Sequence, residues 1–153
     1  MDAMAGYREL RKGRASMAGQ VYLVTFATAA RSPIFSRFEI ASEACRAMTQ
    51  PRLWYGSRLL AWVLMPDHWH GLVELGPLDD LSIVVQKLKS NSARSIRTAH
   101  PEVGSVWAKG FHDRAIRSQN ALRPAARYIV ANPLRADLAE RVGDYPYWNS
   151  VWL

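Results

Sequence analysis

The alternation of apolar and polar positions predicts three β-strands in the first half of the chain. Residues 20–29 (QVYLVTFATA) alternate in this way and are rich in β-branched and aromatic side chains, which favour strands. Two further apolar runs follow at 58–65 (RLLAWVLM) and 68–75 (HWHGLVEL). The break between these two runs is short and contains a proline, so we expect them to be antiparallel neighbours.

Apolar residues spaced three and four apart predict two helices among these strands. The first helix covers 36–49, and its inward-facing residues are Phe38, Ala41, Cys45 and Met48. The second helix starts with Asp79 or Asp80 as its N-cap, because an aspartate oxygen can accept from the first free backbone N–H groups. Its apolar side consists of Leu81, Val84, Val85, Leu88 and Ile96.

The last part of the chain adds a strand, helices and an aromatic tail. Residues 105–118 predict a fourth strand, interrupted near its middle by a glycine. A helix over 121–132 follows, and the proline after it is expected to end it. Residues 134–142 predict a further short helix. The tail at 143–153 either covers a functional site or docks on the sheet.

The order of these elements, β-α-β-β-α-β-α, predicts an α+β fold with a ferredoxin-like antiparallel sheet and helices packed on one face. With 153 residues and no internal repeat, the chain is expected to form a single domain over residues 1–153. Residues 1–18 are expected to be a basic flexible arm. Folds of this kind host many functions, so the function has to come from individual residues.

The charge of the chain favours a polyanionic partner such as nucleic acid. Lys and Arg exceed Asp and Glu enough to give a formal net charge of +7. Two groups of basic residues are candidates for binding phosphates; the alternative for both is an ordinary solvated surface. They are Arg8, Arg11, Lys12 and Arg14 in the arm and Lys87, Lys89, Arg94 and Arg97 on the second helix.

Several classes of protein are disfavoured. Cys45 is the single cysteine, so neither an internal disulfide nor a thiolate zinc site can form. The apolar run at 59–65 is too short to cross a bilayer, and the N-terminal residues show no apolar core of a signal peptide. We therefore expect a cytoplasmic protein with no membrane partner.

Two histidines form the first candidate site. His68 and His70 are two positions apart on a predicted strand, so they point to one face, and Trp69 points to the other. Two imidazoles on one face can bind a single metal ion; the alternative is a pair of strand residues without a ligand. His100 and His112 are not at a ligand-like spacing, so oxygen ligands would complete the site, which makes Mg²⁺ or Mn²⁺ plausible.

The last predicted helix carries the second candidate pair. Tyr128 and Asn132 are four residues apart and are therefore expected on one helix face. A tyrosine offers a nucleophilic oxygen, and an asparagine offers an oxygen ligand. The alternative is a tyrosine at the edge of the core and an asparagine near a helix end.

Two segments together, MPDHWHGLVEL at 65–75 and ARYIVANPLRADLAERVGDYPYWNS at 126–150, resemble the REP-associated tyrosine transposases. These proteins are relatives of the single-tyrosine transposases in the HUH endonuclease superfamily. Three more segments look similar to the family, so the resemblance covers the chain from about residue 19 onward. They are GQVYLVTFAT at 19–28, VVQKLKSNSAR at 84–94 and VWAKGFHDRAIR at 106–117.

The resemblance implies an HUH endonuclease-type fold and a set of site residues. His68 and His70 would hold a divalent cation, Tyr128 would be the nucleophile, and Asn132 would complete the metal site where relatives usually have glutamine. Asp67 stands where the family often has asparagine, and either residue can cap a turn.

The resemblance also implies a reaction and a partner. The chain would cut and rejoin single-stranded or hairpin DNA with REP-like palindromes through a 5′-phosphotyrosine intermediate. It would act in the cytoplasm on the nucleoid, as a monomer or, alternatively, as a domain-swapped homodimer.

Two other functions fit part of the same residues. A non-catalytic basic nucleic-acid-binding module would explain the charge but leave His68, His70 and Tyr128 without a role. A metal-dependent hydrolase using a bound water would explain the histidines but leave Tyr128 unused.

Overall fold

The computed structural model describes residues 19–152 of the chain. The arm predicted at 1–18 and its basic residues Arg8, Arg11, Lys12 and Arg14 lie outside the described residues. Within 19–152, no helix is both long enough and apolar enough to cross a membrane.

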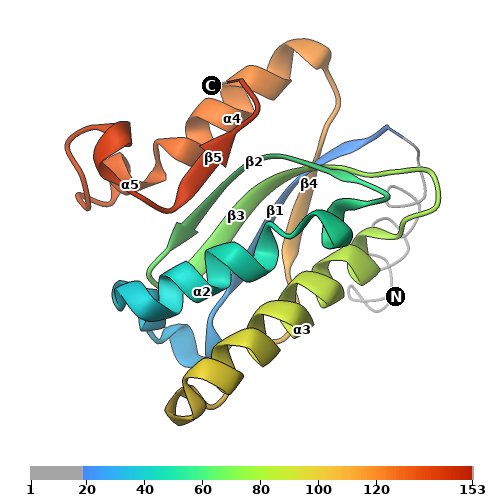
Figure 1. Cartoon of the computed structure of the whole chain (residues 1–153). Coiled ribbons are helices and arrows are strands. Elements are labelled where there is room, and N and C mark those ends of the chain that lie inside the picture. Colours follow the sequence, from blue (N-terminus) through green and yellow to red (C-terminus); the bar gives the residue numbers. More distant parts are fainter. Residues whose placement is uncertain (1–18, 153) are drawn as a thin grey trace, which may run out of the picture.

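A five-stranded antiparallel sheet forms the centre of the fold, with strand order β4-β1-β3-β2-β5 (Figure 1). The strands are β1 (Val21–Ala27), β2 (Arg58–Met65), β3 (His68–Glu74), β4 (His112–Ile116) and β5 (Trp148–Ser150). The first four strands follow the ferredoxin-like order, which confirms the predicted fold class.

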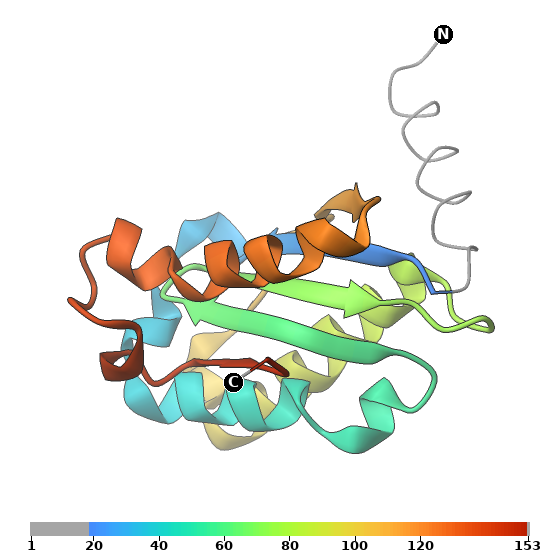
Figure 2. The same cartoon turned by 90° about the horizontal axis from the view of Figure 1, so that it is seen from above.

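The helices cover both faces of this sheet. They are α2 (Phe38–Met48), α3 (Leu81–Ala99), α4 (Leu122–Val130) and the single turn α5 (Asn132–Arg135). Figures 1 and 2 show α2 and α3 side by side on one face and α4 across β2 and β3 on the other. The expectation of helices on one face therefore holds for α2 and α3 but not for α4.

Each face has its own apolar core, which explains why both need a helical cover. Trp69, Phe26 and Leu64 are buried under α2 and α3. On the other face, Val63 and Leu72 are buried against Ile129 of α4. Since both faces of the central strands are apolar, exposing either face to water would cost free energy in proportion to its area.

The sequence predicted α3 more accurately than α2. Asp80 caps α3, since its side chain accepts a hydrogen bond from the backbone N–H of Ser82 at 2.8 Å. In α2, the prediction that Phe38 faces inward is wrong, because its side chain is 66% exposed. The helix begins at Phe38, and Ile40 and Ala41 supply the first buried side chains instead.

The C-terminal segment docks on the sheet, one of the two alternatives for the aromatic tail. β5 pairs with β2, and the hydroxyl of Tyr145 donates to the backbone oxygen of Leu64 at 2.5 Å. The helix predicted over 134–142 is wrong: α5 ends at Arg135, and Asp137 has a left-handed φ of 57°.

Gly71 on β3 is expected to be intolerant of any side chain. A Cβ atom placed there would lie 2.0 Å from the indole ring of Trp69, which is itself 1% exposed. Because that ring stacks on Phe26 with centroids 5.1 Å apart, it cannot move aside without disturbing the core. Gly71→Ala should lower the free energy of unfolding by about 1–3 kcal/mol in urea titrations.

Gly143→Ala is the matched control for that substitution. A Cβ atom at Gly143 meets nothing within 4 Å, so this variant should unfold at nearly the wild-type urea concentration. Equal effects of the two variants would contradict the packing argument.

Candidate functional site

His68 and His70 lie on β3 and point to the face that carries α4. In the strand register, His68 is opposite Ala27 and Met65, and His70 is opposite Thr25 and Val63. Residues directly opposite each other in antiparallel strands share a face, and Val63 and Met65 belong to the core under α4. The two imidazole rings meet edge to face, with centroids 4.6 Å apart. The alternation of the strand thus brings the rings together as predicted.

Both rings are held through the same nitrogen. The Nδ1 of His68 lies 2.7 Å from a carboxylate oxygen of Asp67, and the Nδ1 of His70 lies 2.8 Å from the hydroxyl of Thr25. A carboxylate can only accept, so His68 donates from Nδ1. With Nδ1 engaged in each ring, Nε2 is the nitrogen that each histidine can present to a ligand, the arrangement typical of metal-binding histidines.

Arg31 anchors the carboxylate that orients His68. Its Nε lies 3.3 Å from the second oxygen of Asp67. Arg31 and Ala30 both have left-handed backbone conformations, with φ of 54° and 55°. Non-glycine residues pay about 1–2 kcal/mol for this conformation, so the surrounding contacts must stabilise the turn that presents Arg31. Sequence reasoning gave no role to Arg31 or Thr25, since neither lies near a histidine in the sequence.

Tyr128 lies on α4 with its ring accessible. Ala126 and Ile129 bury the inner side of the helix against the sheet, while Tyr128 is 57% exposed. The guanidinium carbon of Arg135 lies 3.8 Å from the centre of the tyrosine ring, and its Nη2 donates to the backbone oxygen of Tyr128 at 2.6 Å. The phenol therefore stands at the surface, beside a cation, on the sheet face that carries the histidines.

Arg135 also acts on the charge of His70. Burial lowers the pKa of His70 from its usual 6.5 to about 4, and the neighbouring charges of His68, Arg135 and Arg31 add to this effect. The Arg135 guanidinium thus contacts the Tyr128 ring and contributes to lowering the pKa of His70. The sequence offered no signal for this role, because an arginine after a helix break is usually a solvated surface residue.

The stability of the metal-free protein is expected to fall in mild acid because of His70. An unfolded histidine binds its proton near pH 6.5, whereas folded His70 does so only near pH 4. Above pH 6.5, His70 is neutral in both the folded and the unfolded protein, so the full stability is present. Between pH 6.5 and 4, His70 binds a proton in the unfolded protein but not in the folded one, so the free energy of unfolding falls. The total amounts to about 3 kcal/mol at most. Urea titrations from pH 7 to 4 should show this slope, and His70→Gln should flatten it.

Asn132 follows Tyr128 but belongs to the next helical turn. α4 ends at Val130, and Pro133 lies in the first turn of α5, where its missing N–H is tolerated. Asn132 is half-buried at the first position of α5. Among residues 19–152, no third His, Cys, Asp or Glu joins the histidines to form a metal-binding cluster. Further ligands to a cation would therefore be amide, water or substrate oxygens.

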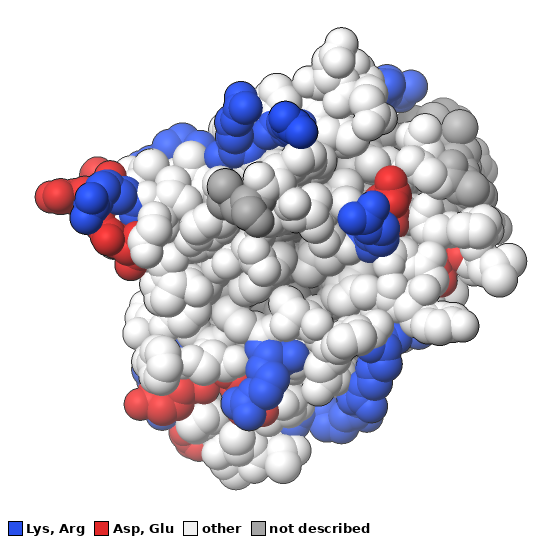
Figure 3. All heavy atoms as spheres, turned by 45° about the horizontal axis from the view of Figure 1, so that its top comes forward, with Lys and Arg blue, Asp and Glu red and all other residues white. Residues whose placement is uncertain are grey.

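The four basic residues predicted as one stripe on α3 have different surroundings in the structure. Lys87 is exposed, while Lys89 and Arg97 line a groove beside the segment 105–111. Arg94 turns towards α2 and donates to the side-chain oxygen of Asn91 at 3.2 Å. On the face shown in Figure 3, Lys and Arg form separate groups round a mostly uncharged middle. All four lie on the face of the sheet opposite to the histidines.

Comparisons of the sequence with known proteins indicate a transposase family. The sequence model of a family described as "Transposase IS200 like" matches residues 16–132. A REP-associated tyrosine transposase of Haemophilus influenzae is 30% identical over 104 residues, which are 61% of this chain and 58% of the relative. One of Escherichia coli K12 is 27% identical over 88 residues, which are 57% of this chain and 50% of the relative. The chain thus matches between 50% and 58% of the length of these relatives.

A solved structure supports the fold. The structure of a REP-associated tyrosine transposase bound to a REP hairpin is similar with a TM-score of 0.67 and 23% identity. The similarity covers 88% of this chain and 79% of that one. At this level of identity, the likeness establishes the shared α+β architecture.

Proposed function

The chain belongs to the IS200-like transposase family, whose members act on DNA, and on this premise we propose that it cuts and rejoins single-stranded DNA through Tyr128. The partner we propose is single-stranded or hairpin DNA with REP-like palindromes. The chemistry of the hydroxyl on α4 and of the two imidazoles on β3 supports this assignment.

The proposed reaction is a transesterification at a backbone phosphate. The Tyr128 oxygen bonds to the phosphorus while the bond from phosphorus to the 3′ oxygen breaks, and the phenol loses one proton while the 3′ oxygen gains one. The products are a 5′-phosphotyrosine and a free 3′-hydroxyl. Because the covalent link keeps the energy of the broken phosphodiester, a 3′-hydroxyl can reverse the step without a nucleotide cofactor.

The residues on β3 fit a divalent cation, Mg²⁺ or Mn²⁺. His68 and His70 would bind it through Nε2, and the amide oxygen of Asn132 has the right chemistry for a further ligand. When bound, the cation would orient the scissile phosphate and balance the charge on its oxygens. Thr25 would then accept from the Nδ1–H of His70, as Asp67 accepts from His68, and so fix both rings.

Arg135 supplies the observation on which the proposal depends. Its guanidinium packs on the Tyr128 ring at 3.8 Å, and its charge contributes to lowering the pKa of His70. Because α4 also packs on β2 and β3, the phenol and the two imidazoles lie on the same face of the sheet. Because α4 packs on the sheet of its own chain, attack within a monomer is the simpler arrangement and is the one we propose.

The sheet face that carries the histidines also presents exposed residues on β4, beyond α4. α4 covers β2 and β3, while His112 and Arg114 are exposed on β4. Thr25 is opposite both His70 and His112, so these side chains stand on one face in a row that leads away from α4. We propose that phosphates of the substrate follow this row, and that the arm residues Arg8, Arg11, Lys12 and Arg14 add contacts to phosphates.

One experiment separates the three candidate functions. The protein is incubated with hairpin-tailed single-stranded DNA and Mg²⁺ or Mn²⁺, and the products are separated under denaturing conditions. We expect an adduct of protein and DNA that survives SDS and disappears after protease treatment. Cleavage without an adduct would favour a hydrolase with a bound water. Binding without cleavage would favour a non-catalytic module.

A further inference from the structure

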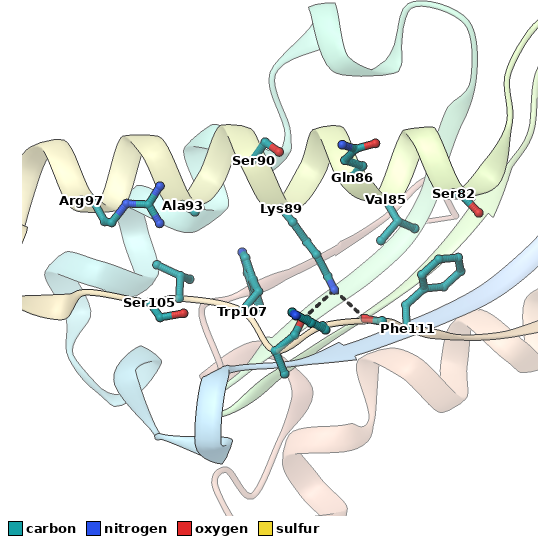
Figure 4. Close-up of a pocket in the computed structure, with 14 residues that line it drawn as sticks. Ser82, Val85, Gln86, Lys89, Ser90, Ala93, Arg97, Ser105, Trp107 and Phe111 are labelled. Carbon is teal, nitrogen blue, oxygen red and sulfur yellow. Dashed lines mark hydrogen bonds between the residues drawn. The ribbon is translucent and has the colours of Figure 1, made fainter. Parts of the chain in front are cut away.

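A groove lies on the far side of the sheet from the histidines, between α3 and the segment 105–111 (Figure 4). Its volume is about 540 Å³, within the range of ligand-binding clefts. Its apolar lining includes Val85, Trp107 and Phe111. The charged side chains that line it are all basic: Lys89, Arg97 and Lys109. A groove lined by both basic and aromatic side chains suits a polyanion that also carries flat apolar faces.

The walls of this groove are preformed. Lys89 extends from α3 and donates to the backbone oxygens of Ala108 at 2.9 Å and Gly110 at 2.5 Å (Figure 4). The indole N–H of Trp107 donates to Ser92 of α3 at 2.9 Å. These bonds hold the segment 105–111 at a fixed distance from the helix. Lys89 therefore has a structural role. Arg97 and Lys109 are the basic residues of the lining that we assign to a ligand.

The segment 105–111, which forms one wall of the groove, is hydrogen-bonded to β1, the strand that pairs with the histidine strand β3. The backbone N–H of Ala108 donates to Ala27 at 2.9 Å, and Ala27 is the register partner of His68. The segment then enters β4, the strand at one edge of the sheet. Phe111 lines the groove, and the next residue, His112, stands in the row with Thr25 and His70 on the opposite face. The β4 edge is thus a short path between groove and histidines.

We propose that the groove binds an unpaired stretch of the DNA strand that Tyr128 attacks, a few nucleotides from the cut, with the strand passing round the β4 edge. Arg97 and Lys109 contact phosphates, and a base packs against Phe111. Stacking on aromatic side chains beside basic residues is the usual way in which proteins hold single strands. This inference rests on the proposed function and adds to it a second contact region on the substrate.

The test compares two double variants that remove the same charge. Arg97→Gln with Lys109→Gln alters the groove, whereas Arg46→Gln with Arg58→Gln alters exposed residues of α2 and β2. Both are made in the Tyr128→Phe protein, so that binding is measured without chemistry. Fluorescence anisotropy gives the affinity for hairpins with and without a single-stranded flank, at several salt concentrations.

We expect the groove variant to bind the flanked hairpin about ten-fold more weakly. Its salt slope should be smaller by about 1.4, because each single-strand phosphate that a cation neutralises adds about 0.7 to the slope. Its affinity for the hairpin without a flank should equal that of the control variant. Equal affinity and slope of both variants on flanked DNA would overturn the inference, as would an equal decrease on both DNAs. Because these measurements are independent of adduct formation, a missing adduct would reject the proposed reaction and leave the groove result standing.

Discussion

Tyr128→Phe is expected to abolish the covalent adduct with DNA and to lower strand cleavage by at least about 10⁴-fold, the scale seen when a nucleophile is removed. The substitution deletes one oxygen atom from an exposed ring. In the wild type, the guanidinium of Arg135 lies 3.8 Å from the centre of the tyrosine ring, and a phenylalanine ring can pack against it in the same way. The fold and the histidine site should therefore persist while the reaction is lost. Gel separation under denaturing conditions measures both products.

The matched control for this variant is Tyr55→Phe. Tyr55 is 96% exposed and borders a pocket with Glu74 and Gly76, at the opposite end of β3 from His68. It loses the same atom, and its cleavage rate should equal that of the wild type. If Tyr128→Phe cut DNA at an undiminished rate with an unchanged melting temperature, Tyr128 would not be the nucleophile.

Local periodicity explains what could be predicted from the sequence. β2 spans 58–65 as predicted, and β1 and β3 lie within their predicted ranges. Residues two apart on a strand share a face wherever that strand lies in the fold. The proximity of His68 and His70 thus needed only the correct identification of one strand.

The placement of α4 could not be predicted in the same way. An amphipathic stripe shows that a helix covers an apolar surface but not which surface it covers. The central strands bury residues on both faces, such as Trp69 on one and Leu72 on the other. The short connection after β4 gave no further information, and the sheet face of Tyr128 became known only from the structure.

The contacts that orient the site are also long-range. Arg31 reaches Asp67, and Thr25 reaches His70, across a strand pairing that brings distant parts of the chain together. Lys89 looked like a surface cation on α3, but its ammonium group binds two carbonyls of another segment. Such pairings depend on register and backbone path, neither of which periodicity specifies.

Removal of either imidazole is expected to have the second large effect. His68→Ala and His70→Ala should each lower Mn²⁺ affinity beyond detection by calorimetry and reduce adduct formation by about 10³-fold or more, since two-histidine coordination would be lost. Chelation of the cation should have the same effect on the wild type, reversible by added Mn²⁺. His100→Ala is the matched control: this residue caps the end of α3, and its loss should leave both measurements unchanged.

Asp67→Asn gives a graded test of the same site. An asparagine oxygen can still accept from the Nδ1 of His68, but the charge that holds Arg31 at 3.3 Å is gone. Loss of such an orienting partner typically costs roughly 10- to 100-fold in metal affinity, so this variant should lie between wild type and His68→Ala. Full adduct formation by His70→Ala in the presence of a chelator would contradict a metal role for the pair. Undiminished adduct formation by Asp67→Asn with Mn²⁺ present would contradict only the orienting role of the carboxylate, because His68 would then hold its tautomer without that charge.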